Sequence, residues 1–167
     1  FIYKAADGVA LDVLAGAEVD LVYLRQGVEE RRIHGLVCEA TDDFSTEESY
    51  VAYKIKVVPR VWCLSLCEKT FIYMNKTIEE ILSDKLQLAG LGEVGLDHEF
   101  RLQGTYPSRS FILQYEESDL DFLSRLCEYW GITYFFDHDG ERDKMVFTDH
   151  ASGFFPISGD SNVRYRR

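Results

Sequence analysis

Carboxylates gather in one short stretch of the sequence whose residue types could act as an acid–base pair. They are Glu116, Glu117, Asp119 and Asp121. Glycosidases use two carboxylates held roughly 5–10 Å apart, one as an acid and the other as a base or nucleophile. Asp119 and Asp121, however, follow Ser118 in the first turn of a predicted helix, where the helix dipole favours negative charge. Because no acid-bearing strand is evident opposite them, we expect these side chains to be structural and the chain to have no catalytic residues.

Histidines and acids elsewhere could ligate a metal. Asp97, His98 and Glu99 are adjacent in a predicted loop, and His34 stands alone in a predicted strand. The segment 137–141, Asp-His-Asp-Gly-Glu, is similar to part of a calcium loop, but it lacks the later glutamate that the EF-hand pattern requires. A solvated loop, a structural histidine and a hairpin turn explain these positions without a metal. We therefore predict no metal ligands and no cofactor-binding residues.

The cysteines do not form a recognisable site either. None of them has Cys-x-x-Cys spacing, and they stand at Cys38, Cys63, Cys67 and Cys127. We interpret them as buried, reduced thiols of a protein that folds in the cytosol. The chain also lacks a Gly-x-Ser-x-Gly elbow, a phosphate loop and a dinucleotide fingerprint. This pattern favours a structural role over an enzymatic one.

Size and composition indicate a folded, acidic protein. The 167 residues are enough for one domain or two small ones, and 46% apolar with 14% aromatic residues is typical of a β-rich core. The net charge of −11, with no basic stripe, argues against nucleic-acid partners. No apolar run approaches the ~20 residues of a membrane span. Since Phe1 begins in mid-pattern without a basic n-region, we expect no signal peptide and a fragment of a longer chain.

The segment 110–149 must position most of the candidate residues. It predicts a strand at Phe111–Glu116 and then a helix that Ser118 caps and Gly131 ends. Strands are predicted at Ile132–Asp137 and Met145–Asp149, joined by a turn at His138–Gly140. The succession is therefore strand, capped helix and hairpin.

The preceding part of the chain predicts a second capped helix and several strands. Thr77 to Glu80 has the spacing of a capping box, and apolar periodicity continues to about Leu88. Long strands are predicted at Val28–Thr41, where Gly35 marks a bulge or corner, and at Tyr50–Val58. Val9–Leu14 and the apolar run around Val61–Leu66 are expected to be extended, and residues 91–109 to form a loop.

Some of these segments resemble a known family. The run Gln-Tyr-Glu-Glu-Ser-Asp-Leu-Asp-Phe-Leu-Ser-Arg-Leu at 114–126, followed by Gly-Ile-Thr-Tyr-Phe-Phe at 131–136, closely resembles the VgrG family. Arg32 to Val37 and the segment from Pro59 to Phe71 are similar to further patterns of these proteins. They are the valine-glycine-repeat spike proteins of bacterial type VI secretion and relatives of contractile-phage tail hubs.

The resemblance implies a β-rich α+β fold of the phage-tail-hub type. We expect a small partial β-barrel over residues 1–60 and an α+β unit with two capped helices and a β-hairpin over 61–167. The resemblance also implies that the chain is the hub region of a homotrimeric spike. Such a spike docks on a hexameric tail tube, contacts baseplate components and carries secreted effectors. Assembly would take place in the bacterial cytoplasm, before secretion by the type VI system. The C-terminal β-helical needle of these spike proteins is absent from this sequence. The residues that form the trimer and tube interfaces cannot be named from the sequence.

Other interpretations remain open at this stage. A contractile-phage or phage-like tail hub shares the architecture and differs in its biological context. A stand-alone hydrolase or carbohydrate-binding domain is a more distant alternative, which activity on peptidoglycan would favour.

Overall fold

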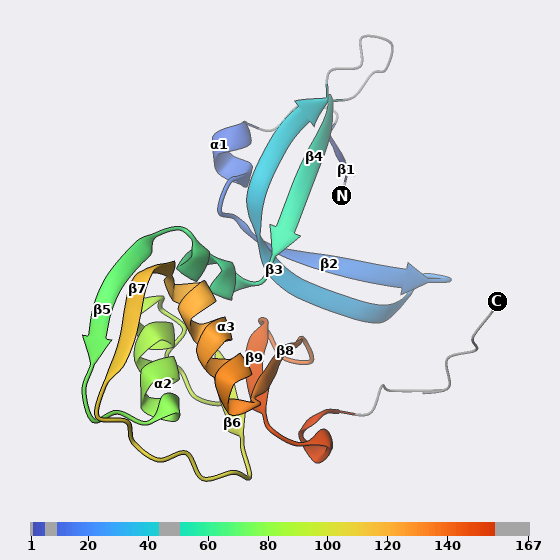
Figure 1. Ribbon diagram of the computed structural model, residues 1–167. Helices are drawn as coiled ribbons and strands as arrows, with labels where there is room; N and C mark the ends of the chain where they lie inside the picture. Colours follow the sequence, from blue (N-terminus) through green and yellow to red (C-terminus); the bar gives the residue numbers. More distant parts are fainter. Residues whose placement is uncertain (1, 6–9, 44–50, 156–167) are drawn as a thin grey trace, which may run out of the picture.

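The computed structural model describes residues 2–5, 10–43 and 51–155, which form a strand-rich N-terminal part followed by a part that mixes strands and helices (Figure 1). The strands are β1 (Ile2–Ala5), β2 (Glu18–Arg25), β3 (Val28–Asp43), β4 (Val51–Val58), β5 (Glu68–Tyr73), β6 (His98–Arg101), β7 (Ile112–Ser118), β8 (Thr133–Asp137) and β9 (Lys144–Thr148). The helices are α1 (Leu11–Leu14), α2 (Ile78–Leu88) and α3 (Asp119–Trp130), with 3₁₀ turns η1 (Arg60–Ser65) and η2 (Ala151–Gly153). The fold is α+β and rich in strands, as the sequence predicts.

The N-terminal part is an open, bent sheet in the order β1-β4-β3-β2. The long strand β3 pairs with β2 through its first half and with β4 through its second half, and Leu36 takes part in both pairings. Gly35 stands at this change of partner, where a Cβ added to the glycine would lie 2.7 Å from the Val58 carbonyl oxygen. Glycine is therefore required by a close backbone approach, and the irregular register falls just beyond it, between Val37 and Glu39.

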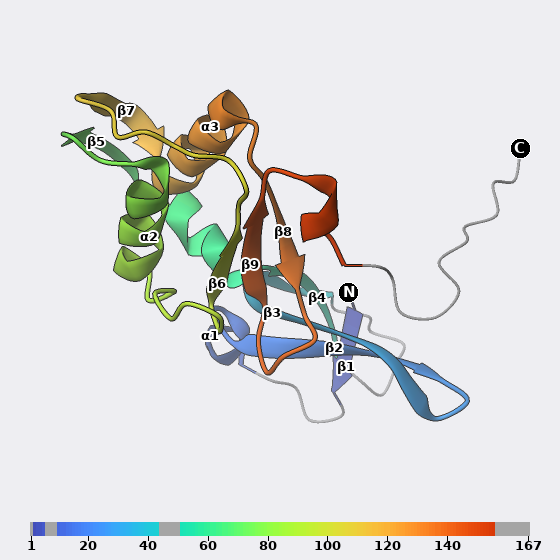
Figure 2. The same cartoon turned by 90° about the horizontal axis from the view of Figure 1, so that it is seen from below.

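The rest of the chain packs two small sheets around α2 and α3 (Figure 1, Figure 2). Strands β5 and β7 form an antiparallel ribbon, and the second sheet has the order β6-β9-β8. One hydrophobic core joins these elements. Its fully buried members from the two helices are Ile81, Leu82, Leu86, Phe122 and Leu123, and the sheet adds Met145 and Phe147.

The local signals for helix ends are confirmed. Thr77 and Glu80 form the complete capping box of α2, and the Ser118 hydroxyl accepts a hydrogen bond from the Asp121 amide at the start of α3. Gly131 ends α3 at a φ of 69°. The turn between β2 and β3 lies at Gln26-Gly27, where both residues have positive φ, as a tight hairpin requires.

Other expectations are wrong. Residues 11–14 form a single helical turn, and residues 60–65 form a 3₁₀ helix after Pro59 because the chain must turn sharply from β4 into the α+β part. The expected loop 91–109 contains β6, which lies parallel to β9. The turn between β8 and β9 runs over residues 138–143 and is longer than expected. Residues 44–50, which include Tyr50 at the start of the second long strand predicted above, lie outside the described residues.

Candidate functional site

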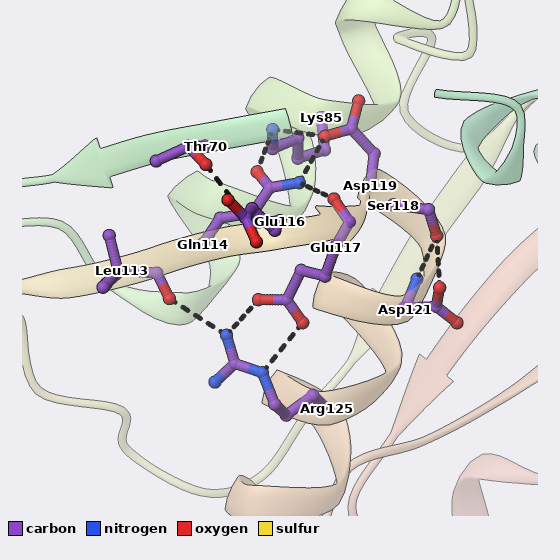
Figure 3. A network of polar contacts seen from close by, with 10 residues as sticks. All are labelled: Thr70, Lys85, Leu113, Gln114, Glu116, Glu117, Ser118, Asp119, Asp121 and Arg125. Carbon is purple, nitrogen blue, oxygen red and sulfur yellow. Dashed lines mark hydrogen bonds and ion pairs between the residues drawn. The ribbon is translucent and has the colours of Figure 1, made fainter. Parts of the chain in front are cut away.

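The centre of the segment 114–121 is a buried network around one lysine (Figure 3). The Lys85 ammonium on α2 donates to the Asp119 carboxylate at 2.5 Å and to the Gln114 side-chain oxygen at 2.7 Å. The Gln114 amide nitrogen donates in turn to Asp119 and to the Glu117 carbonyl oxygen, at 3.0 Å each. The residues Lys85, Gln114 and Asp119 are each at most 2% exposed. The network therefore ties α2, β7 and the start of α3 together.

Aromatic rings surround the buried ammonium. The Lys85 nitrogen lies 5.6 Å from the ring centres of Phe71, Tyr73 and Phe122. A cation over ring faces is stabilised by their quadrupoles, and more so away from water. Lys69, on β5, donates to the other oxygen of Asp119 at 2.7 Å from a half-exposed position. The carboxylate thus has one buried and one exposed cationic partner.

Asp119 is held in its ionised form. Burial alone would raise the pKa of this carboxyl, but the hydrogen bonds from Lys69, Lys85 and Gln114 hold the pKa below its ordinary value. A general acid in glycoside hydrolysis needs the opposite shift. Asp119 is therefore a structural anion, and its role is larger than the helix-dipole contact that the sequence suggests.

The neighbouring carboxylates also have structural partners. Asp121 accepts from the Ser118 hydroxyl at 2.6 Å, and Glu117 forms a two-point ion pair with Arg125 at 3.0 and 2.5 Å. Glu116 lies in the bulge of β7 at a φ of 46°, and its amide donates to the Thr70 hydroxyl. None of these carboxylates lines either of the grooves found in the described part of the chain. The geometry gives no support to an acid–base pair here.

Lys85 is the residue that sequence reasoning missed. The apolar stripe of α2 is predicted from Ile78, Ile81, Leu82 and Leu86, and Lys85 lies within the same stripe. A lysine on a buried helix face needs an anionic partner. That rule points to a buried carboxylate elsewhere, although not to which one.

A second polar network fastens the β8–β9 turn to the chain entering the α+β part. Arg60 donates to the Asp143 carboxylate at 2.6 and 2.9 Å and to the Asp97 carboxylate at 3.0 Å. Burial would raise the pKa of Asp97, but the Glu93 amide and Arg60 hold the pKa below its ordinary value. The expectation of a solvated loop at Asp97 is wrong, since this side chain is 3% exposed. Asp97 directly precedes the short strand β6, which pairs non-locally with β9, and its carbonyl oxygen accepts from the Met145 amide at 2.9 Å, which holds this position in the interior.

The histidine and acid candidates for metal binding are scattered. His98 is buried and its Nδ1 contacts the Leu91 carbonyl oxygen at 2.9 Å, whereas Glu99 forms ion pairs with Arg101 and Lys144. Asp137 accepts from the Asp139 amide within the turn. Within residues 10–43 and 51–155, no cluster of three or more His, Cys, Asp or Glu side chains could hold a metal. The absence of a metal site stays a prediction.

His34 takes part in a contact that joins the two parts of the fold. Its Nδ1 lies 2.7 Å from the Asp20 carboxylate, and its backbone amide donates to Nδ1 of His138 at 3.2 Å. The rings of His34 and His138 are stacked with centres 6.1 Å apart. Burial lowers the pKa of His138, which favours the neutral ring that accepts this hydrogen bond. The structural interpretation of His34 is therefore supported by named partners.

The cysteines differ in exposure. Cys127 is buried, and burial raises the pKa of its thiol to about 12. Cys38 and Cys63 are half-buried. Cys67 is exposed, so the prediction of a buried thiol is wrong there, because the chain leaves η1 at the surface before β5 begins.

Comparison with known proteins agrees with this arrangement. The model of one family, described as phage tail baseplate hub (GPD), matches residues 2–167. The chain belongs to the phage tail baseplate hub family. As a member of it, the chain is 27% identical over 93% of its length to the type VI secretion system spike protein VgrG1c of Pseudomonas aeruginosa. It is 30% identical over 89% of its length to the actin cross-linking toxin VgrG1 of Vibrio cholerae.

A solved structure shows the same fold. It is the E. coli c3393 protein, described as a component of the type VI secretion system that is structurally similar to the T4 bacteriophage tail proteins gp27 and gp5. The TM-score is 0.80 at 25% identity, covering 92% of this chain and 42% of that chain. This baseplate hub chain spans 21% and 14% of the lengths of the curated relatives named above. Together these matches identify a structural, hub-like component of a contractile injection system. The VgrG resemblance is thereby confirmed.

Proposed function

We propose that this region forms the hub of a VgrG-type spike, which docks on the hexameric tail tube and carries the needle. The main support is the fold match with a type VI secretion component over 92% of the chain. The interior of the α+β part is consistent with a scaffold, because its charged groups are paired in closed networks. We propose a boundary near residue 60, with a partial barrel over 1–60 and an α+β unit over 61–167.

The proposal includes location and partners. The spike would assemble in the bacterial cytoplasm and leave through the type VI machinery. Its partners would be two further copies of itself, the tail tube, baseplate components and secreted effectors. This region would have no enzymatic activity of its own, so purified protein should not release soluble fragments from peptidoglycan. In the described residues, no helix has the length and apolar character needed to cross a membrane.

Secretion of the tube provides the test. Deleting the whole gene should abolish release of the tail-tube protein into the medium, and the intact gene should restore it. Restoration by a gene from which the codons for residues 1–167 have been removed would refute a hub role. Unchanged tube release, with loss of phage-like particles instead, would favour the second candidate, a phage tail hub, which the description of the matching family also suggests.

The assembly state gives a second test. We expect residues 1–167 alone to be monomeric or weakly associating and the intact spike to be a stable trimer. The reason is the charge of −11 on each copy, which opposes close approach most strongly at low salt. An intertwined needle would provide most of the trimer stability. Sedimentation from micromolar to millimolar concentration at low and high salt checks this. A salt-independent trimer at micromolar concentration would place the assembly energy in the hub region itself.

A further inference from the structure

The β5–β7 ribbon presents one covered and one uncovered face. Tyr73 and Gln114 point inward and are buried, whereas the facing pair Ile72 and Leu113 points outward. Apart from Thr70 at the bulge, the side chains on this outer side, including those of the flanking Met74 and Phe111, are apolar or aromatic and are 37–61% exposed. This surface, here called the ribbon face, consists of Ile72, Met74, Phe111, Leu113 and Tyr115. Side chains of this size expose on the order of several hundred Å², which on a soluble protein typically marks an interaction site.

A shallow groove continues the ribbon face toward α3. Arg109 lies at the groove with its guanidinium 4.8 Å from the Trp130 ring centre, and it also contacts the Tyr129 hydroxyl. Among the described residues, no carboxylate pairs with Arg109, in contrast to Arg125, which Glu117 neutralises. The exposed carboxylate of Glu116 at the other end of β7 is likewise without a described cationic partner. The ribbon face therefore lies between an available cation and an available anion.

The hairpin of β2 and β3 forms an arm with matching properties. Its tip turns at Gln26-Gly27 and carries exposed apolar side chains on both strands, namely Val22, Tyr23, Leu24 and Val28, which are 39–66% exposed. Glu30 is the extra residue where the register shifts, and in the described structure no cation pairs with it. Arg25 adds an exposed cation beside the turn. The arm thus offers apolar side chains together with an available anion and an available cation.

The arm and the ribbon face lie at opposite ends of the molecule (Figure 1, Figure 2). One copy therefore cannot cover its own ribbon face with its own arm. Two copies can do so, because one offers the arm and the other the ribbon face. Such a head-to-tail contact uses different surfaces on each copy and closes into a ring when the rotation between copies allows it.

We propose that the arm of one copy lies across the ribbon face of a second copy. Tyr23 and Val28, which share one face of the arm with Arg25, pack on Leu113 and its neighbours, while Glu30 meets Arg109 and Arg25 meets Glu116. The charges set the direction of the arm along the ribbon, while the apolar contact supplies most of the attraction between two acidic chains. We take the partner to be a second copy of this chain for two reasons. The proposed hub function, on which this inference rests, requires self-assembly, and the two surfaces are complementary.

Directed cross-linking tests the contact itself. Cys67→Ser removes the exposed native thiol, and Val28→Cys or Leu113→Cys is then added to chains of two distinguishable lengths. Mixed at high concentration and moderate salt in a thiol–disulfide buffer, the Val28→Cys and Leu113→Cys chains should form the mixed disulfide well above the yield of Leu113→Cys with itself. Glu79→Cys, on the exposed side of α2, serves as the matched control partner for Val28→Cys and should stay at background.

Charge reversal tests the direction. Arg109→Glu or Glu30→Arg alone should lower the mixed yield about two- to fivefold, since an exposed ion pair contributes roughly 0.2–1 kcal/mol. The two reversed chains together should restore it. Yields equal to the control, no restoration, or a dominant Leu113→Cys self-disulfide would each overturn the proposal. Tube release and trimer mass are measured separately. If the cross-link does not form while tube release and trimer mass are as expected, this contact is refuted and the proposed hub function is not.

Discussion

Replacing the buried lysine should unfold the hub region more easily than replacing the exposed lysine that binds the same carboxylate. In Lys85→Met, Asp119 keeps Lys69 but loses its 2.5 Å partner inside a region that water does not reach. Breaking a buried ion pair costs about 3–5 kcal/mol. We expect the lower end, about 3 kcal/mol, because Lys69 remains and the methionine stem fills the space between the rings. The matched Lys69→Met should cost at most about 1 kcal/mol, because Lys69 is 48% exposed.

Urea melts followed by tryptophan fluorescence and circular dichroism measure both losses near neutral pH. The double variant Lys85→Met/Asp119→Leu should recover part of the loss, because it removes the stranded charge together with its partner. The sign of the pH dependence follows from the lowered pKa of Asp119. Its contribution is present above the unfolded value of about 4 and is lost as pH falls through the folded pKa. Equal losses in the two lysine variants would refute this account of the network.

Further predictions concern single positions. Ser118→Ala should lower the free energy of unfolding by about 0.5–2 kcal/mol through loss of the cap, and an unchanged urea midpoint would speak against that role. Gly35→Ala should cost about 1–3 kcal/mol because its Cβ would meet the Val58 carbonyl, so a neutral result would mean that β3 and β4 separate without cost. His138→Gln should flatten the pH dependence of stability between neutral pH and about pH 5. The wild type should lose stability there as pH falls below the unfolded pKa toward the lowered folded pKa; parallel curves would exclude the histidine contact as the cause. Elemental analysis after dialysis should find no zinc or calcium, and one equivalent of either would contradict the prediction of no metal site.

The sequence alone determined the elements whose ends depend on neighbouring residues. Thr77 and Glu80 satisfy each other's backbone amides within one turn, and Ser118 and Gly131 mark the limits of α3 in the same local way. These interactions form whatever the rest of the chain does, so their spacing is sufficient to predict them. The family motif at 114–126 is likewise continuous in the sequence, because its residues lie in one strand and the helix that follows. It could therefore indicate the fold type without knowledge of distant contacts.

Tertiary structure decided the contacts between distant segments. Lys85 meets Asp119 across 34 positions, and Arg60 meets Asp143 across 83. The strand β6 exists because β9 lies beside it, and the 3₁₀ turn η1 exists because β4 must lead into the helical part. Such features depend on which surfaces are brought together in space, and a four-residue strand or a single lysine in an apolar stripe carries too little local information to specify its partner.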